Sequence, residues 1–185
     1  AGNVNLEVAD NGGIIFNKAS EDEIDQSGST YFNEEDKNLD WNGRKTTFAF
    51  DLALTAMENG DFTIWVLAFN KQNDDQTYSH VEEIRLGIAK TEAGYVASEL
   101  VGVNWTNADY DNIIANGTSF EIKDNDAEIE FVVNYDNSKL SYTFNVNEIQ
   151  IEGQKDIEGI VGFRYLWNAA TSVNGIVLEN LTQSD

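Results

Sequence analysis

Apolar and polar residues alternate along short segments of this chain, and Asn, Asp and Gly separate the segments. The clearest pair runs from Ile129 to Tyr135 and from Leu140 to Val146, where every second residue is apolar. A period of two places such residues on one face of a β-strand. Residues 136–139, Asp-Asn-Ser-Lys, are typical of a tight turn. The pattern therefore predicts an antiparallel hairpin.

The same pattern predicts further strands on both sides of this hairpin. An opening hairpin is expected around the turn at 11–13, and the run Phe62 to Phe69 is apolar on both faces, as in a strand at the middle of a sheet. The other expected strands lie at 48–54, 84–89, 95–103, 160–167 and 176–181. Residues 18–43 are polar and acidic and predict a long surface loop, and Ile113-Ile114 could form one helical turn.

Nine or ten short antiparallel strands without a long helix predict an all-β fold. One open sheet would leave an apolar face in water, so we expect two face-packed sheets, a β-sandwich of jelly-roll type. A chain of 185 residues fits one domain, residues 1–185, with enough buried surface for a core. No apolar run approaches the roughly 20 residues of a spanning helix.

The charge of the chain limits its partners. There are 33 acidic and 11 basic residues, so the formal net charge is -22. Such a surface repels polyanions, so nucleic acid, anionic membranes and sulfated or uronic-acid glycans are disfavoured unless calcium bridges the two. The chain has no Cys, which excludes disulfides, thiolate metal sites and a Cys nucleophile.

Aromatic residues make up 11% of the chain and suggest sugar binding. A pyranose ring stacks its apolar face on Trp or Tyr, while amides, carboxylates and Arg bind its hydroxyl groups. We expect contacts from four tryptophans and one arginine: Trp41, Trp65, Trp105, Trp167 and Arg164. For Trp65, on a strand that is apolar on both faces, burial in the core is the more common alternative. Arg85 and Arg164 could instead pair with nearby carboxylates.

Clusters of Asp and Asn offer the oxygen ligands that calcium prefers. The candidate ligands are Asp74 and Asp75 in one cluster and Asp109 and Asp111 in another. Neither cluster has the glycine and closing glutamate of a helix-loop-helix calcium loop, and solvated turns also explain them. Calcium with a structural role is therefore expected, and solvated turns without a metal are the alternative.

The residues of common catalytic sites are scarce. His80 is the only histidine, and its loop-like surroundings predict a surface position. Glu128 and Glu130 share a strand face about 7 Å apart, but the residues between them belong to the core face. A solvated outer face explains the pair better than an acid-base site does.

The order of these segments resembles the concanavalin A-like jelly-roll superfamily. The matching pieces are Phe48 to Leu52 leading to Asp61 to Trp65, the hairpin from Val132 to Phe144, and the closing segments 160–163 and 175–178. Glucanases of this superfamily resemble one another in a Glu-x-Asp-x-x-Glu strand. The nearest match begins at Glu23 and Asp25, but Gly28 replaces the second glutamate. The resemblance therefore implies binding without cleavage.

The first hypothesis is a non-catalytic carbohydrate-binding module for a neutral polysaccharide or oligosaccharide. The resemblance implies a lectin-like module that is secreted or displayed on a bacterial cell surface and linked to other modules of a larger protein. A calcium-stabilised structural or adhesive module is the second hypothesis. A glycoside-cleaving enzyme with an unrecognised acid pair is the third.

Overall fold

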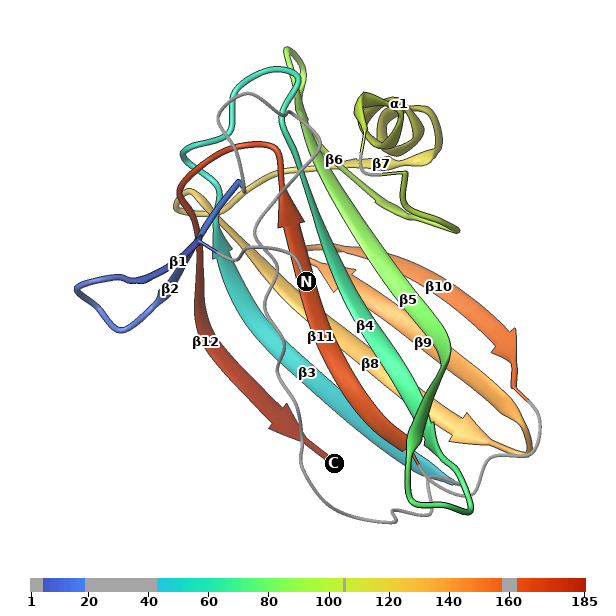
Figure 1. The fold of residues 1–185 in the computed structure, drawn as a ribbon. Coiled ribbons are helices and arrows are strands. Elements are labelled where there is room, and N and C mark those ends of the chain that lie inside the picture. The colour runs from blue at the N-terminus through green and yellow to red at the C-terminus, as the bar shows by residue number, and fades with distance from the viewer. Residues whose placement is uncertain (1–4, 19–42, 105, 158–162) are drawn as a thin grey trace.

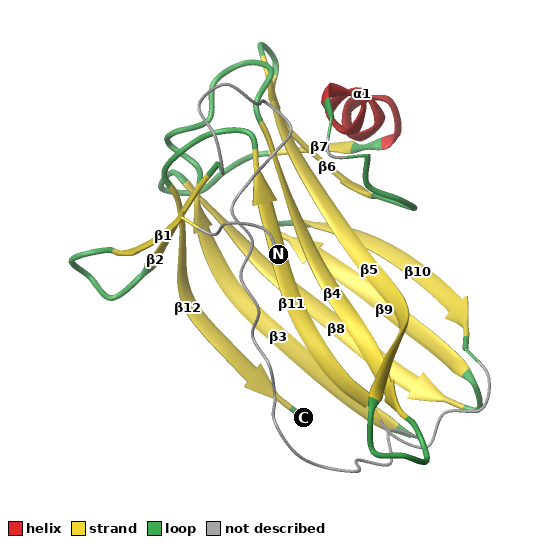
Figure 2. Cartoon of the chain, viewed as in Figure 1, coloured by secondary structure: helices red, strands yellow, loops and turns green. Residues whose placement is uncertain are grey.

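Two antiparallel sheets face each other in the computed structural model (Figure 1), which describes residues 5–18, 43–104, 106–157 and 163–185. The described residues form twelve strands and one helix, and loops at both ends connect the strands (Figure 2). The predicted all-β sandwich of jelly-roll type is thus confirmed. The predicted surface loop at 18–43 lies almost entirely outside the described residues.

The larger sheet has seven strands in the order β1-β2-β12-β3-β8-β9-β10. Their bounds are β1 Asn5–Val8, β2 Ile14–Asn17, β3 Arg44–Ala53, β8 Asp126–Asp136, β9 Lys139–Val146, β10 Ile149–Asp156 and β12 Ile176–Ser184. The predicted hairpin is β8 and β9, with Phe131 opposite Phe144. Asn137 and Ser138 both have positive φ, as a two-residue hairpin turn requires. The opening hairpin, β1 and β2, is also confirmed.

The smaller sheet has five strands in the order β11-β4-β5-β6-β7. Their bounds are β4 Phe62–Gln72, β5 Tyr78–Thr91, β6 Gly94–Glu99, β7 Thr118–Phe120 and β11 Phe163–Thr171. The long β4–β5 hairpin is the centre of this sheet, and β11 continues it on the other side of β4. This places β4 between two partners, as its apolar pattern predicted.

Aromatic rings form much of the core between the sheets. Trp65 of β4 packs edge-on against Phe16 of β2 with ring centroids 5.0 Å apart, and Phe50 of β3 lies 5.3 Å from the same ring. Phe131 and Phe144 continue the cluster across β8 and β9 at 4.6 Å. Such contacts hold the sheets together because each ring buries a large apolar area and edge-to-face pairs add to it.

A second core lies on the outer face of the smaller sheet, where helix α1 (Asn107–Asn116) covers it. Ile113 of α1 is fully buried together with Ile64 and Val66 of β4. Gly87 of β5 permits this approach, because a Cβ there would lie 2.7 Å from the Ile113 side chain. Packing on both faces of β4 explains why its sequence does not alternate between apolar and polar residues.

Three details differ from the sequence-based expectation. Twelve strands are present in the described residues instead of nine or ten, because β7 and β10 were not predicted. Strand β10 lies at the sheet edge with half-buried inner residues, so its apolar signal is weak. Helix α1 has ten residues, although only one turn at Ile113-Ile114 was expected. In the described part of the chain, no helix is long and apolar enough to span a membrane.

Candidate functional site

The structure corrects the expectation that Trp65 contacts a ligand. Its side chain is only 2% exposed and belongs to the core between the sheets. Its indole Nε1 is buried and has no hydrogen-bond partner among the described residues. A ring enclosed by Phe16 and Phe50 offers no face to a sugar, and the alternative of core burial is the correct one.

The other predicted stacking residues remain predictions. Trp41 and Trp105 lie outside the described residues. Trp167 and Arg164 lie on β11, where their backbones pair with Leu67 and Asn70 of β4, but their side chains are outside the described set.

Two further sequence-based expectations concern charged residues, and the structure confirms both. His80 is exposed and lies 3.3 Å from a Glu83 carboxylate oxygen. Arg85 pairs with the same glutamate at 2.6 Å, the alternative to ligand contact that the sequence left open.

The acidic residues considered for calcium have local roles in the structure. Both carboxylate oxygens of Asp109 accept backbone hydrogen bonds at the start of α1, from Asn104 at 2.9 Å and from Thr106 at 3.3 Å. Asp75 accepts two hydrogen bonds from Thr77, which lower the pKa of its carboxyl group. Asp74 and Asp111 are exposed. Within the described ranges, no group of three or more His, Cys, Asp or Glu could hold a metal ion.

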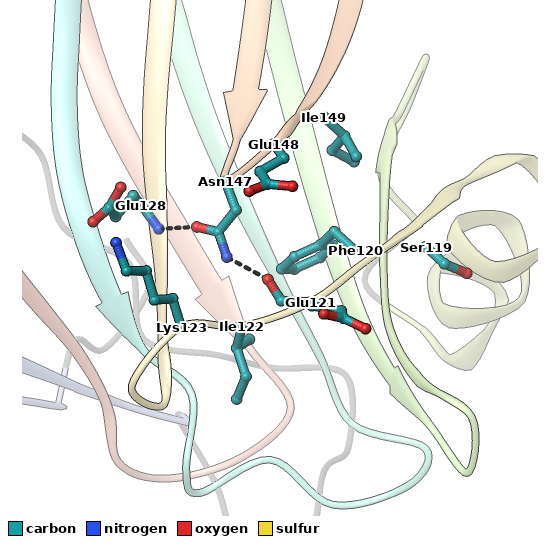
Figure 3. Close-up of a pocket in the computed structure, with 9 residues that line it drawn as sticks. All are labelled: Ser119, Phe120, Glu121, Ile122, Lys123, Glu128, Asn147, Glu148 and Ile149. Atoms are coloured by element: carbon teal, nitrogen blue, oxygen red, sulfur yellow. Dashed lines mark hydrogen bonds between the residues drawn. The ribbon is translucent and has the colours of Figure 1, made fainter.

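A pocket with a volume of about 490 Å³ lies beside β7, the β7–β8 connection and the β9–β10 turn (Figure 3). We call it the β7–β10 pocket. Its lining consists of one continuous segment before β8, one residue of β8 and the β9–β10 turn: Ser119, Phe120, Glu121, Ile122, Lys123, Glu128, Asn147, Glu148 and Ile149. A volume between 300 and 1,000 Å³ is usual for pockets that bind small molecules.

Asn147 joins the three parts of this pocket. It occupies the β9–β10 turn with φ of 49°, a left-handed conformation that Asn tolerates better than most residues. Its side-chain oxygen accepts the Glu128 backbone N–H at 2.7 Å, and its side-chain nitrogen donates to the Glu121 carbonyl at 2.6 Å. Figure 3 shows both bonds from the single amide. The β9–β10 turn is thereby fixed to β8 and to the β7–β8 connection.

The pocket combines an apolar wall with charged groups. Phe120 is buried and its ring centroid lies 5.9 Å from that of Tyr95, while Ile122 and Ile149 pack against the core and keep part of their surface exposed. Glu121 and Glu148 are exposed, and neither forms an ion pair in the part of the chain that the structure describes. Such a lining can contact the apolar face of a ring and hydrogen-bond its substituents.

A second hollow, the sheet-face groove, crosses the outer face of β8, β9 and β10. It comprises adjoining hollows of about 580 and 380 Å³ that share Asn134, Ser141 and Gln154. These side chains and those of Thr143 and Glu152 form no hydrogen bonds with the described residues. The groove is lined mainly by polar residues, with Val132 and Tyr142 as its large apolar members, so it is less apolar than the β7–β10 pocket. The exposed Glu128 and Glu130 confirm that this face of β8 is solvated.

Polar contacts made by Tyr142 and Lys155 link the two sheets on the side of β10. The buried Tyr142 hydroxyl donates to Glu99 of β6, and burial together with this carboxylate raises the pKa of Tyr142. Lys155 of β10 donates to a Glu82 carboxylate oxygen of β5 at 3.0 Å. Gly153 is required beside Tyr142, because a Cβ at this position would overlap the tyrosine ring. These residues position β10, and therefore the β9–β10 turn.

Sequence reasoning missed the residues of the β7–β10 pocket because it predicted no strand between Val146 and residue 160. One signal was available: Asn147-Glu148 directly follows an alternating strand, and Asn at such a place predicts a turn. The other wall comes from 119–123, where β7 has only three residues and leaves almost no periodic pattern. The approach of these two segments depends on tertiary packing.

The sequence matches no family model and no curated protein sequence. Its fold is similar to that of the legume lectin-like domain from Entamoeba histolytica, with a TM-score of 0.51, 13% identity and coverage of 98% of this chain and 87% of that chain. Lectin II from Ulex europaeus gives a TM-score of 0.54 at 8% identity and covers 98% of this chain and 90% of that chain. An engineered GH43 glycoside hydrolase gives 0.53 at 11% identity, but the match covers only 36% of that longer chain.

These similarities define the fold class: the chain is an antiparallel β-sandwich with the fold of these lectin structures. The jelly-roll arrangement expected from the order of its segments is therefore confirmed, and no particular family is assigned. Identities of 8 to 13% establish the fold alone.

Proposed function

We propose that this chain is a non-catalytic carbohydrate-binding module and that the β7–β10 pocket holds a sugar residue of a neutral oligosaccharide or polysaccharide. The observation that carries the proposal is an apolar wall, Phe120 and Ile149, beside two carboxylates, Glu121 and Glu148, that form no ion pair with the described residues, in a lectin-like fold. Sugars offer both kinds of surface, apolar C–H faces and hydroxyl groups.

Charge supports a glycan without acidic groups. The formal charge of -22 and the carboxylates of the pocket disfavour a uronic-acid or sulfated ligand. Charged residues at a binding surface govern encounter and selectivity more than total affinity. A net charge of this size also favours solubility. That the module is a secreted or surface-displayed part of a larger bacterial protein, with structural calcium, is a further part of the proposal.

Absence of catalysis is part of the proposal. Paired acids of a glycosidase lie about 5 to 9.5 Å apart across the scissile bond. Glu121 and Glu148 both line the pocket, and the proposal assigns them to hydrogen bonds with sugar hydroxyl groups instead of to acid-base catalysis. The glucanase-like segment that begins at Glu23 lacks its second glutamate and lies outside the described residues.

Titration of the chain with soluble β-glucan, xylan and starch oligosaccharides by calorimetry tests the proposal. Glu148→Ala and Glu121→Ala should each weaken the best ligand about tenfold, as expected for loss of a charge-assisted hydrogen bond. Glu7→Ala is the matched control, because Glu7 is exposed on β1 at the opposite edge of the larger sheet. Equal affinities in all four proteins would place the site elsewhere, and release of reducing ends would contradict the non-catalytic assignment.

A further inference from the structure

The charges that line the β7–β10 pocket do not balance. Three glutamates, Glu121, Glu128 and Glu148, and one lysine, Lys123, line it. The amine of Lys123 lies on the Glu128 side of the pocket (Figure 3). Neither Glu121 nor Glu148 has a cationic partner among the described residues. The pocket therefore retains unneutralised negative charge beside its apolar wall.

This arrangement bears on the chemistry of the ligand. The apolar wall and the size of the pocket fit a sugar ring, as the proposed function requires. A hydroxyl group can donate a hydrogen bond to Glu148 or Glu121, but it leaves their charge uncompensated. A protonated amine donates the same bond and also neutralises charge, which makes the bond shorter and stronger.

We infer that the preferred ligand of the β7–β10 pocket is a sugar that carries a free, protonated amino group, a de-N-acetylated hexosamine. The inference rests on the proposed function for the site and for a sugar ligand, but it replaces the neutral sugar by a cationic one. An ammonium group about 4 Å from one exposed carboxylate gains roughly fivefold in affinity in water, and two carboxylates gain more. We therefore expect an amino sugar to bind about ten- to thirtyfold more tightly than the matching neutral sugar at low salt.

The test compares three oligosaccharides of equal length and linkage: β-1,4-linked glucosamine, N-acetylglucosamine and glucose. The measured quantity is the ratio of the glucose to the glucosamine dissociation constant at pH 6 and low salt. The ratio should be about 10 to 30 at low salt. It should approach 1 at pH 9, where the amine of the ligand is neutral.

Two substitutions locate the effect. Glu148→Gln and Glu121→Gln retain hydrogen-bonding groups and remove one charge each, so each should lower the ratio about three- to fivefold. Glu7→Gln changes the net charge of the chain equally at the far edge of the larger sheet and should leave the ratio within twofold.

The outcomes separate this inference from the proposed function. Binding of all three oligosaccharides with a ratio near 1 keeps the proposed function and overturns the inference. A high ratio that falls equally in Glu7→Gln and Glu148→Gln also overturns the inference, because the amine is then attracted by the net negative charge of the whole protein and not by the carboxylates of the pocket. Failure of all three to bind, together with failure of the wider glycan panel, overturns both.

Discussion

Asn147 provides the sharpest test of how the β7–β10 pocket is built. Replacement by Ala removes its two side-chain hydrogen bonds to Glu128 and Glu121, each worth about 0.5 to 1.5 kcal/mol and closer to the lower value at an exposed site. Alanine also tolerates the left-handed backbone conformation at this position, φ of 49°, less well than Asn does, which costs about 1 kcal/mol. The expected loss of unfolding free energy is about 2 to 3 kcal/mol, or roughly 5 to 10 °C in Tm for a chain of this size.

Asn147→Gly separates the two contributions. Glycine adopts positive φ without steric cost, so this variant should lose only the hydrogen bonds, about 1 to 2 kcal/mol. Gln150→Ala, an exposed change on the neighbouring strand, is the control and should stay within about 0.5 kcal/mol. Urea unfolding followed by tryptophan fluorescence measures all three. Equal stability of Asn147→Ala and the parent protein would refute the assigned role of the amide.

Three further predictions concern the scaffold. Trp65→Ala should lower the unfolding free energy by about 3 to 5 kcal/mol, because it opens a cavity beside Phe16 and Phe50. Sugar affinity, measured at temperatures at which the variant is folded, should be unchanged. A loss of affinity in the folded variant would show that Trp65 contacts the ligand. Thr106→Ala removes the cap of α1 and should cost about 1 kcal/mol in urea unfolding, whereas an unchanged midpoint would contradict the capping box. Burial and four nearby carboxylates raise the pKa of Asp126. Its folded-state pKa therefore exceeds the unfolded value, and the stability present at acid pH is lost as pH rises through the folded pKa. Asp126→Asn should stabilise the protein at pH 7 by less than about 1 kcal/mol and have no effect below pH 3; a destabilised variant at pH 7 would contradict the repulsion.

Local periodicity predicted the strands whose two faces differ. In β8 and β9 every second residue is buried, so the printed sequence already shows which side faces the core. Strand β4 was recognisable for the opposite reason, since an unbroken apolar run needs cover on both faces. The short β7 and the half-buried edge strand β10 have neither signal, because pairing with neighbours rather than burial defines them.

The site was less predictable because it depends on contacts between distant segments. The roles of Phe120 and Ile149 follow from the packing of β7 and β10 against the core, which no local pattern records. Trp65 illustrates the converse error: a residue type suited to sugar stacking was assigned to binding, although the sheet encloses it. Net charge predicts a ligand without acidic groups and requires no knowledge of the fold, and this ligand class stays a prediction.

Stability and binding can be separated in this pocket by the burial of its residues. Glu121 and Glu148 are exposed and form no ion pair with the residues that the structure describes, so substitutions there should change unfolding free energy by less than about 0.5 kcal/mol. Asn147 and Phe120 line the pocket and also stabilise the fold, so substitution of either residue should both lower stability and distort the site. A binding defect at Glu121 or Glu148 with a native unfolding curve therefore identifies a direct contact, whereas a defect at Asn147 alone does not distinguish a lost contact from a moved turn.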